Sequence, residues 1–295
     1  MHKSGKTLVL TAGRYQAKIV TVGAGLAELT YLERHLVVPH KPEEMPAAHM
    51  GKVLIPWPNR IAGGRYQYAG KTFTPAVNDR ESGSAIHGLL AWQNWQFAHQ
   101  SASEVTLTAF LPPTYGYPFM LASKVTWRLD AQAGLSACIA TQNLGDAPAP
   151  YGAGAHPYLT CNLEKVDSCT LVIPAEQAFS LDAQRHPLRL VDAHELGLLF
   201  STPRKIGATT VDHTFKTLPP GKTWEVRLTS QRQAMSTFLR SSQPWLQIYT
   251  GDKLNRIGLA VEPMSCPPDA FNSGLDLLSL APGQTHQLRF SIGGE

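Results

Sequence analysis

Short runs of alternating apolar and polar residues occur along most of the chain. In one of them, Val105, Leu107 and Ala109 are apolar, whereas Thr106 and Thr108 between them are polar. This period of two is typical of a β-strand that packs one face against a core and leaves the other face wetter. Comparable runs occupy residues 125–129, 135–139, 225–230, 236–240, 245–250, 259–262 and 287–292.

Glycine and turn signals separate these runs at short intervals. Near the N-terminus, Gly23 and Gly25 interrupt closely spaced β-rich segments. Residues 65–73 predict a hairpin that turns at Ala69-Gly70. Such spacing favours antiparallel meanders over strand–helix–strand units, whose crossovers need more residues.

Helical patterns are weak, and they occur only at residues 42–49 and 193–199. We find no internal repeat, linker or shift in composition that would mark a second domain. Many short strands joined by loops of similar length predict an all-β fold, an antiparallel β-sandwich. We expect residues 1–295 to form one such domain.

Two of the predicted strands carry polar groups on one face. Gln247 and Tyr249 alternate with apolar residues and therefore point the same way. Farther along, Glu262 stands at the end of an apolar run and is followed by Pro263. Proline favours an extended conformation for the residue before it. Taken alone, Glu262 is better explained as a solvated strand end that the proline terminates.

A histidine occurs in the same setting as this glutamate. His156 directly precedes Pro157 and follows a run of small residues, 152–154. A lone histidine is more often a hydrogen-bonded structural residue. Together, however, an imidazole and a carboxylate on stiffened backbones have the chemistry of an acid–base pair.

Composition and charge limit the classes of partner. Hydrophobic residues make up 43% of the chain and charged residues 16%, as in globular proteins. The net charge of +4 and the absence of long basic runs argue against a nucleic-acid partner and slightly favour an anionic small substrate. No segment has the length of a signal peptide core or a membrane span, so we expect a cytoplasmic protein without a membrane partner.

Cofactor and metal motifs are missing from the sequence. Cys138, Cys161, Cys169 and Cys266 are irregularly spaced and include no C-x-x-C pair, so we expect reduced thiols and no zinc site. Residues 23–25 resemble part of a nucleotide loop but lack the third glycine and a following helical pattern. We therefore expect neither a metal nor a cofactor.

Further candidate residues lie in loops. Pro56 and Pro58 lie just before Asn59 and Arg60, which predicts that these side chains are held in place before a ligand arrives. His87 precedes Trp92 and Trp95. Aromatic and polar groups side by side suit a carbohydrate site, although core packing accounts for tryptophan equally well.

The motifs, taken in order, resemble the signature of the aldose 1-epimerase (galactose mutarotase) family and span nearly the whole chain. They are Asn59-Arg60-Ile61 with Gly64-Arg65-Tyr66, Ile86-His87-Gly88, Ala155-His156-Pro157-Tyr158, Asp212-His213-Thr214-Phe215, Gln247-Ile248-Tyr249-Thr250-Gly251, and Glu262-Pro263 with Pro268-Asp269-Ala270-Phe271-Asn272. Residues 87–92, 111–119 and 262–267 are also similar to the bacterial branch that includes sulfoquinovose mutarotases. Met264 departs from the glutamine that family members often carry there.

The resemblance implies a large galactose-mutarotase-like β-sandwich, or supersandwich, that acts on a monosaccharide without a cofactor. It implies interconversion of the anomers of a hexopyranose, with sulfoquinovose or a related 6-substituted aldose as substrate. Glu262 would be the general base and His156 the general acid. The residues implied to line the sugar site are Asn59, Arg60, His87, Asp212, Gln247 and Tyr249.

Several alternatives remain open from the sequence. The substrate can be galactose, glucose or a hexose 6-phosphate, and the protein can also be a non-catalytic carbohydrate-binding sandwich. A glycoside hydrolase would need a second carboxylate, for which Asp212 and Asp269 are candidates. Arg60 or Lys253 is expected to bind an anionic group at C6. Both a monomer and a homodimer are compatible with the sequence.

Overall fold

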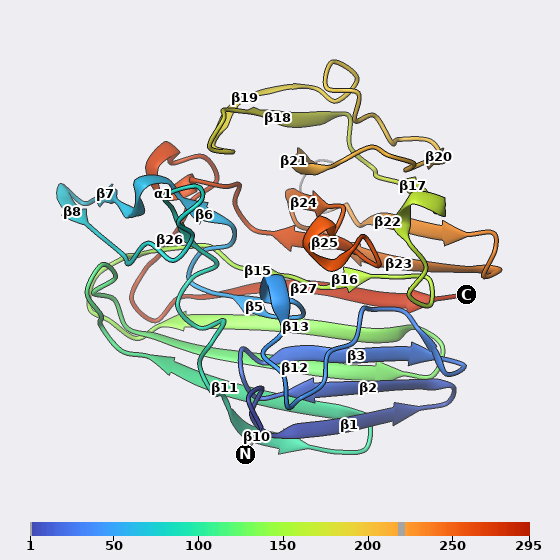
Figure 1. The fold of residues 1–295 in the computed structure, drawn as a ribbon. Coiled ribbons are helices and arrows are strands. Elements are labelled where there is room, and N and C mark those ends of the chain that lie inside the picture. Colours follow the sequence, from blue (N-terminus) through green and yellow to red (C-terminus); the bar gives the residue numbers. More distant parts are fainter. Residues whose placement is uncertain (1, 218–221) are drawn as a thin grey trace.

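The computed structural model describes residues 2–217 and 222–295, and antiparallel β-sheet dominates them (Figure 1). The largest sheet has nine strands. In spatial order they are β10 (Gln96–Gln100), β11 (Glu104–Leu111), β12 (Leu121–Asp130), β13 (Gly134–Asn143), β27 (Thr285–Gly294), β23 (Met235–Ser241), β22 (Trp224–Ser230), β17 (Thr170–Val172) and β20 (Arg204–Lys205).

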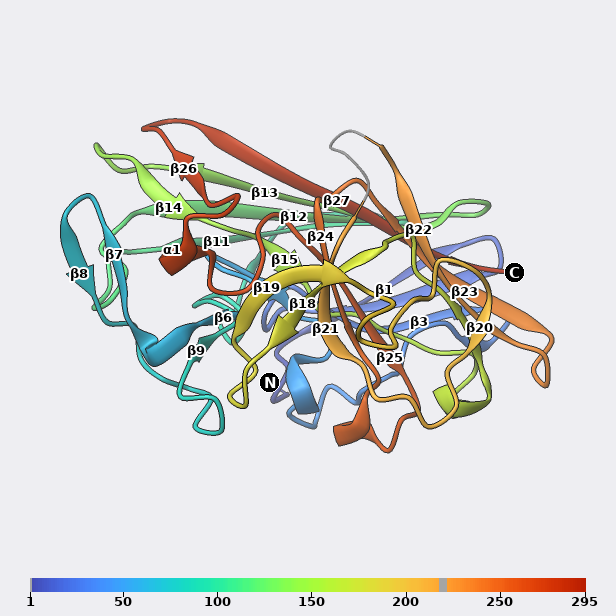
Figure 2. The ribbon, with the colours of Figure 1, turned by 90° about the horizontal axis from the view of Figure 1, so that it is seen from above.

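A second sheet has eight strands and carries Asp212, Gln247, Tyr249 and Glu262. Its order is β19 (Pro187–Asp192), β18 (Gln177–Leu181), β21 (Asp212–Lys216), β24 (Trp245–Tyr249), β25 (Leu259–Met264), β15 (Gly154–Ala155) and β5 (Val53–Leu54), with β16 (Tyr158–Leu159) also paired to β25. The β18–β19 hairpin is one edge of this sheet, at the top of Figure 1 and nearest the viewer in Figure 2.

The N-terminal segments form a four-stranded sheet, which lies against β11 and β12 of the large sheet. Its strands are β1 (Thr7–Ala12), β2 (Tyr15–Val20), β3 (Gly25–Tyr31) and β4 (Arg34–His35). Leu10 of β1 and Val125 of β12 belong to the same buried apolar cluster. Trp127 of β12 donates a hydrogen bond from Nε1 to the carbonyl oxygen of Ala24, at 3.0 Å. The predicted all-β sandwich is therefore confirmed.

Short elements connect the sheets. The small strand pairs are β6 (Arg60–Ile61) with β9 (Ala85–Ile86), β7 (Tyr66–Tyr68) with β8 (Lys71–Phe73), and β14 (Ala149–Tyr151) with β26 (Leu278–Leu280). The helical pieces are α1 (Ala270–Ser273) and the 3-10 turns η1 (Ala47–His49), η2 (Ala62–Gly64), η3 (Val166–Ser168) and η4 (Asp252–Leu254). Tyr68 pairs with Lys71, so the hairpin predicted at Ala69-Gly70 is confirmed.

The structure corrects two expectations about local elements. The helical patterns do not form helices: residues 193–199 make a turn, and residues 42–49 contain only η1, in which Ala48 has a positive φ of 48°. Pro263 does not end its strand either. It pairs with Leu246 inside β25, because the fixed φ of proline is compatible with an extended strand. Glu262 is therefore an interior strand residue.

No helix in the described part of the chain combines the length and apolar character that crossing a membrane requires.

Candidate active site

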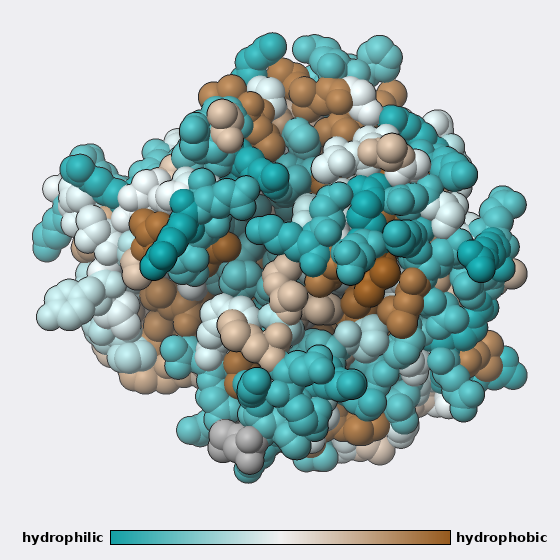
Figure 3. Space-filling model, in the orientation of Figure 1, coloured by the Kyte–Doolittle hydropathy of each residue, from teal (hydrophilic) through white to brown (hydrophobic). Residues whose placement is uncertain are grey.

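A cleft of about 870 Å³ opens on one face of the eight-stranded sheet. In the view of Figure 3, this face is hollowed near its centre, and hydrophilic side chains form much of the rim. Strands β21, β24 and β25 form the floor, and the loops around η1, η4 and the tip of the β18–β19 hairpin form the walls. The volume lies within the range that small-molecule sites occupy.

Register across the floor places one row of polar side chains side by side. Thr214 of β21 is opposite Gln247 of β24, and Gln247 is opposite Glu262 of β25. On the other side of β25, Gly154 pairs with Met264 and Tyr158 pairs with Ala260. The same register continues through the residue between them, His156. Directly opposed residues on one sheet face are in contact range, so His156 faces Glu262.

A second row lies two residues along the same strands and therefore on the same face. In it, Asp212 is opposite Tyr249, and Tyr249 is opposite Ala260. Ala260 is small and buried, and the rings of Tyr249 and Tyr158 pack against each other beside it, with centroids 6.3 Å apart. The alternation of Gln247 with Tyr249, predicted from the sequence, thus places both side chains in the cleft.

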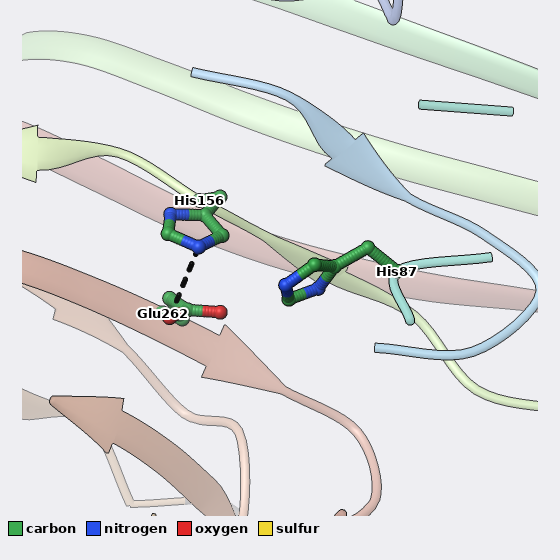
Figure 4. Close-up of side chains that lie close together, drawn as sticks. All are labelled: His87, His156 and Glu262. Atoms are coloured by element: carbon green, nitrogen blue, oxygen red, sulfur yellow. Dashed lines mark ion pairs between the residues drawn. The ribbon is translucent and has the colours of Figure 1, made fainter. Parts of the chain in front are cut away.

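His156 and Glu262 form the central pair of the cleft. Nε2 of His156 lies 3.4 Å from Oε1 of Glu262 (Figure 4). Only 5% of His156 and 2% of Glu262 is exposed. The backbone of His156 is fixed as well, because its N–H donates to Lys52 O and its carbonyl accepts from Gly51 N–H, each at 2.9 Å.

Burial opposes charge on both members of this pair. It raises the pKa of Glu262 well above the usual value, with a smaller contribution from Asp212. It lowers the pKa of His156 to about 3, and His49 adds to this effect. Both shifts favour the uncharged forms of the two side chains. Since the two groups lie within reach of each other and of one ligand, the pair is suited to acid–base chemistry.

His87 extends the pair toward the cleft wall. Its ring lies edge-on to that of His156, with centroids 5.1 Å apart. His87 has a φ of 62°, and its N–H donates to the carbonyl oxygen of Asn59, itself at a φ of 52°, over 2.7 Å. A left-handed conformation is unfavourable for a residue other than glycine and persists where the surrounding structure enforces it. Both loops are thus held in position, in agreement with the rigidity predicted around Asn59.

Arg60 and Asp212 supply charge close to Glu262, and both affect its pKa. Nη1 of Arg60 donates to Arg185 O at 2.6 Å. Asp212 accepts a hydrogen bond from Gln247 Nε2 at 2.7 Å and forms an ion pair with Arg185. Burial lowers the pKa of Arg60, and the nearby Asp212 opposes that effect.

Several buried polar atoms of the cleft residues have no hydrogen-bond partner within the described structure. They are Asn59 Oδ1, Arg60 Nε, His87 Nδ1, His156 Nδ1 and Glu262 Oε2. A buried polar atom without a partner costs roughly 1–3 kcal/mol. Such a concentration in one cleft indicates a polar ligand that supplies the missing partners.

The same centre also contains a possible set of metal ligands. His87, His156 and Glu262 each offer one ligand atom, and the three atoms lie within 4.8 Å of one another. Two imidazoles and one carboxylate make up a known zinc donor set. These residues are the ones that could hold a divalent cation, and they are also the groups best placed for proton transfer.

All eight residues proposed from the sequence line this one cleft, and Lys253 lines it too. Asp269 has a different position. Its Oδ1 accepts hydrogen bonds from Ala62 N and Asn272 Nδ2, so it organises a loop. The two tryptophans expected either in a carbohydrate site or in the core have different positions. Trp95 is buried in the core, whereas Trp92, 37% exposed, forms part of the cleft wall.

Other residues of the cleft were not predicted from the sequence, among them His49 and Arg185. His49 packs against His87 and Trp92, with ring centroids 4.5 and 5.2 Å away, but lies in a stretch with a helical pattern. Arg185 lies at the tip of the β18–β19 hairpin. The alternation of Phe179 and Leu181 before this tip was the available signal for the hairpin.

Known proteins resemble this chain in sequence and in fold. The family model described as aldose 1-epimerase matches residues 6–293. The chain is 58% identical to the uncharacterized protein YihR of Escherichia coli strain K12 over 295 residues, which are all of this chain and 95% of that protein. The fold of the present chain is similar to that of a GalM/aldose epimerase homologue from C. elegans. The TM-score is 0.87 at 18% identity, with 98% of each chain covered.

A further structural relative is the galactose 1-epimerase from Lactobacillus acidophilus NCFM. The TM-score is 0.83 at 17% identity, with 98% of this chain and 93% of that chain covered. At such identities these similarities establish the fold. The family model covers nearly the whole sequence, and on that basis the protein belongs to the aldose 1-epimerase family and is an epimerase enzyme.

Proposed function

We propose that the protein interconverts the α and β anomers of a hexopyranose by opening and closing its ring. The observation that carries this proposal is the buried His156–Glu262 pair, 3.4 Å apart, at the floor of a cleft with room for a hexopyranose. Anomer exchange requires one group that accepts a proton and another that donates one. The proposal needs no redox step and no covalent adduct.

In the proposed reaction, Glu262 accepts the proton of the C1 hydroxyl while His156 donates a proton to the ring oxygen. The bond between C1 and the ring oxygen breaks, and an open-chain aldehyde forms. Rotation about the C1–C2 bond presents the other carbonyl face. The ring then closes as the hydroxyl returns its proton to His156 and Glu262 protonates the new C1 oxygen.

This cycle leaves the enzyme unchanged, because the two residues exchange roles between opening and closing. A pair that holds one proton serves both half-reactions. In the closed-ring complex, the C1 hydroxyl donates to Glu262 and the ring oxygen accepts from His156, which favours the ionised arrangement of the pair. Acid–base assistance contributes roughly 10²–10⁴-fold to such a step.

The other cleft residues would orient the sugar. Asp212 is suited to accept hydrogen bonds from two adjacent hydroxyls, and Gln247 and Tyr249 lie beside it. Asn59 and His87 carry unpartnered polar atoms near the pair, so sugar hydroxyls can supply their missing partners.

We further propose that the substrate carries an anionic group at C6, as sulfoquinovose does. Cationic side chains at the cleft support this proposal, and charge-assisted hydrogen bonds are about twice as strong as neutral ones. Of the two cations proposed from the sequence, Arg60 is the better candidate. It has a buried, unpartnered Nε, whereas Lys253 is 70% exposed and lies 3.7 Å from Glu81.

An anomer-exchange assay tests the proposed function. Exchange NMR would be measured with galactose, glucose, glucose 6-phosphate and sulfoquinovose, with and without enzyme. We expect acceleration of anomer exchange, with the highest kcat/KM for sulfoquinovose. Sugar binding without accelerated exchange would instead indicate a carbohydrate-binding protein. Equal efficiency on glucose and sulfoquinovose would contradict the substrate proposal.

A further inference from the structure

The tip of the β18–β19 hairpin is a well-organised turn that reaches the cleft. The Asp182 side chain accepts hydrogen bonds from the backbone N–H of Gln184 and of His186, each at 2.8 Å. Arg185, between these residues, has a φ of 65°. The turn therefore fixes the backbone of Arg185 in a conformation that an arginine rarely adopts.

A second contact ties this tip to the loop before β9. Nε2 of His186 lies 3.4 Å from Oγ of Ser84 in that loop. Arg185 itself contacts two charged residues of the cleft, because its carbonyl oxygen accepts from Arg60 and its guanidinium pairs with Asp212. The side chain of Arg185 is 51% exposed, so it can move without loss of core packing.

The contact with Asp212 competes with the sugar. Both oxygens of this carboxylate are engaged in the absence of substrate, Oδ1 by Gln247 and Oδ2 by Arg185. A sugar that donates two hydroxyls to Asp212 must displace Arg185 or share the carboxylate with it. An anionic group on the same sugar offers Arg185 a new partner and so compensates for the lost one. A neutral sugar offers no such partner.

We propose that Arg185 is a specificity-determining residue. It pairs with Asp212 in the free enzyme and transfers to the anionic substituent of the substrate, with Arg60 beside it, which releases Asp212 to bind sugar hydroxyls. This inference rests on the proposed mutarotase function and names the chemical class of its substrate, an aldose with a sulfonate or phosphate group.

The test compares Arg185→Gln with the wild-type enzyme on sulfoquinovose, glucose 6-phosphate and glucose by exchange NMR. We expect kcat/KM for the preferred anionic sugar to fall at least tenfold, through KM at nearly constant kcat, because ground-state and transition-state binding are lost alike. For glucose, kcat/KM should rise, since Asp212 is no longer occupied. The two anionic sugars distinguish a sulfonate site from a phosphate site.

Arg189→Gln is the matched control, because Arg189 is an exposed residue of the same hairpin and the charge change is identical. It should leave the ratio of efficiencies at the wild-type value. Arg185→Lys keeps the charge but not the planar fork, and we expect an intermediate ratio. If Arg185→Gln lowered all efficiencies equally, or left the anionic-to-neutral ratio unchanged, the inference would be wrong. Failure of the wild-type enzyme to accelerate any exchange would instead refute the proposed function.

Discussion

At the scale of single residues, the cleft places polar groups where burial makes them reactive. Glu262 and His156 are almost fully inaccessible, and each has its pKa shifted toward the neutral form. Neither shift would occur at the surface, where water stabilises both charges. This arrangement lowers the stability of the fold, because several buried polar atoms around the pair lack hydrogen-bond partners in the absence of a ligand. Perturbed groups of this kind concentrate at functional sites.

Lys52, behind the cleft wall, is another ionisable group whose burial costs stability. It is fully buried, donates from Nζ to Val22 O at 2.7 Å and lies 5.1 Å from the centre of the Trp92 ring. No carboxylate of the described residues pairs with it. Burial lowers its pKa from 10.5 to about 8. The unfolded chain therefore binds this proton more tightly than the folded chain, which destabilises the fold as pH decreases from 10.5 to 8.

We predict that Lys52→Met stabilises the protein. The pKa shift corresponds to about 3 kcal/mol at pH 7, and loss of the bond to Val22 offsets about 1 kcal/mol of it. The free energy of unfolding in urea should thus rise by about 2 kcal/mol at pH 7. The gain should be about 1 kcal/mol smaller at pH 9, where the folded lysine is largely neutral.

Lys124→Met is the control for this prediction, because Lys124 is exposed on β12. Its effect on unfolding should be within about 0.5 kcal/mol at both pH values. A destabilised Lys52→Met variant, or a gain in unfolding free energy that does not depend on pH, would show that the buried charge of Lys52 does not destabilise the fold.

The residues of the cleft differ in how far sequence predicts them. Gln247 and Tyr249 follow from strand alternation, and the same pattern places Glu262 on a defined face. Burial does not follow from the pattern, since it depends on the loops that cover the strand. His49 carries no local signal at all. It reaches the cleft because Ala48 and His49 both adopt a positive φ.

At the scale of elements, the site depends on a strand that is interrupted. β15 and β16 both pair with β25, and His156 lies between them with its backbone bonded to residues 51 and 52. Gly51 makes this possible. Its φ is 73°, and a Cβ atom there would lie 2.0 Å from the carbonyl oxygen of Leu26. The close backbone contact thus connects β3, the η1 loop and His156.

We predict that Gly51→Ala is strongly destabilising. Both a left-handed alanine and a backbone clash are introduced, and we expect a loss of about 3 kcal/mol or more. Gly70→Ala is the matched control, because its φ is 74° but nothing lies within 4 Å of the added Cβ. That change should cost about 1 kcal/mol. Unfolding in urea measures both.

The activity of the same variants tests the connection to His156. Displacement of a catalytic group by about 1 Å can lower the rate roughly 100-fold. We expect slower anomer exchange for folded Gly51→Ala and unchanged exchange for Gly70→Ala. Equal stability losses for the two glycine variants would contradict the proposed role of the close contact.

Elements with regular alternation and a clear turn signal were predictable from the sequence. Elements whose extent depends on neighbouring strands or on long-range contacts were not. The β7–β8 hairpin follows from its Ala-Gly turn. β25 extends past Pro263 because neighbouring strands on both sides hold it, which local preference does not reveal. The turn at residues 193–199 has apolar spacing like that of a helix, but Leu198 N–H bonds to Ala193 O and the chain turns.

At the scale of the whole molecule, the fold brings together residues from distant parts of the sequence. Alternation predicts which face of a strand is buried, but not which strand lies beside it. β27 at the C-terminus lies between β13 and β23, and β25 lies between β24 and the β15–β16 pair. The meeting of His156 with Glu262 is a result of this strand order. Only the ordered motifs of the family indicated it in advance.

The central claim is that these two residues act as one acid–base pair on a sugar. The most direct test is the rate of anomer exchange, measured by exchange NMR on saturating sugar, for Glu262→Gln, His156→Ala and the double variant. We predict that each single change lowers kcat at least 100-fold and that the double variant is little worse, because groups that act as a unit are not additive. Near wild-type exchange in either folded single variant would contradict the account.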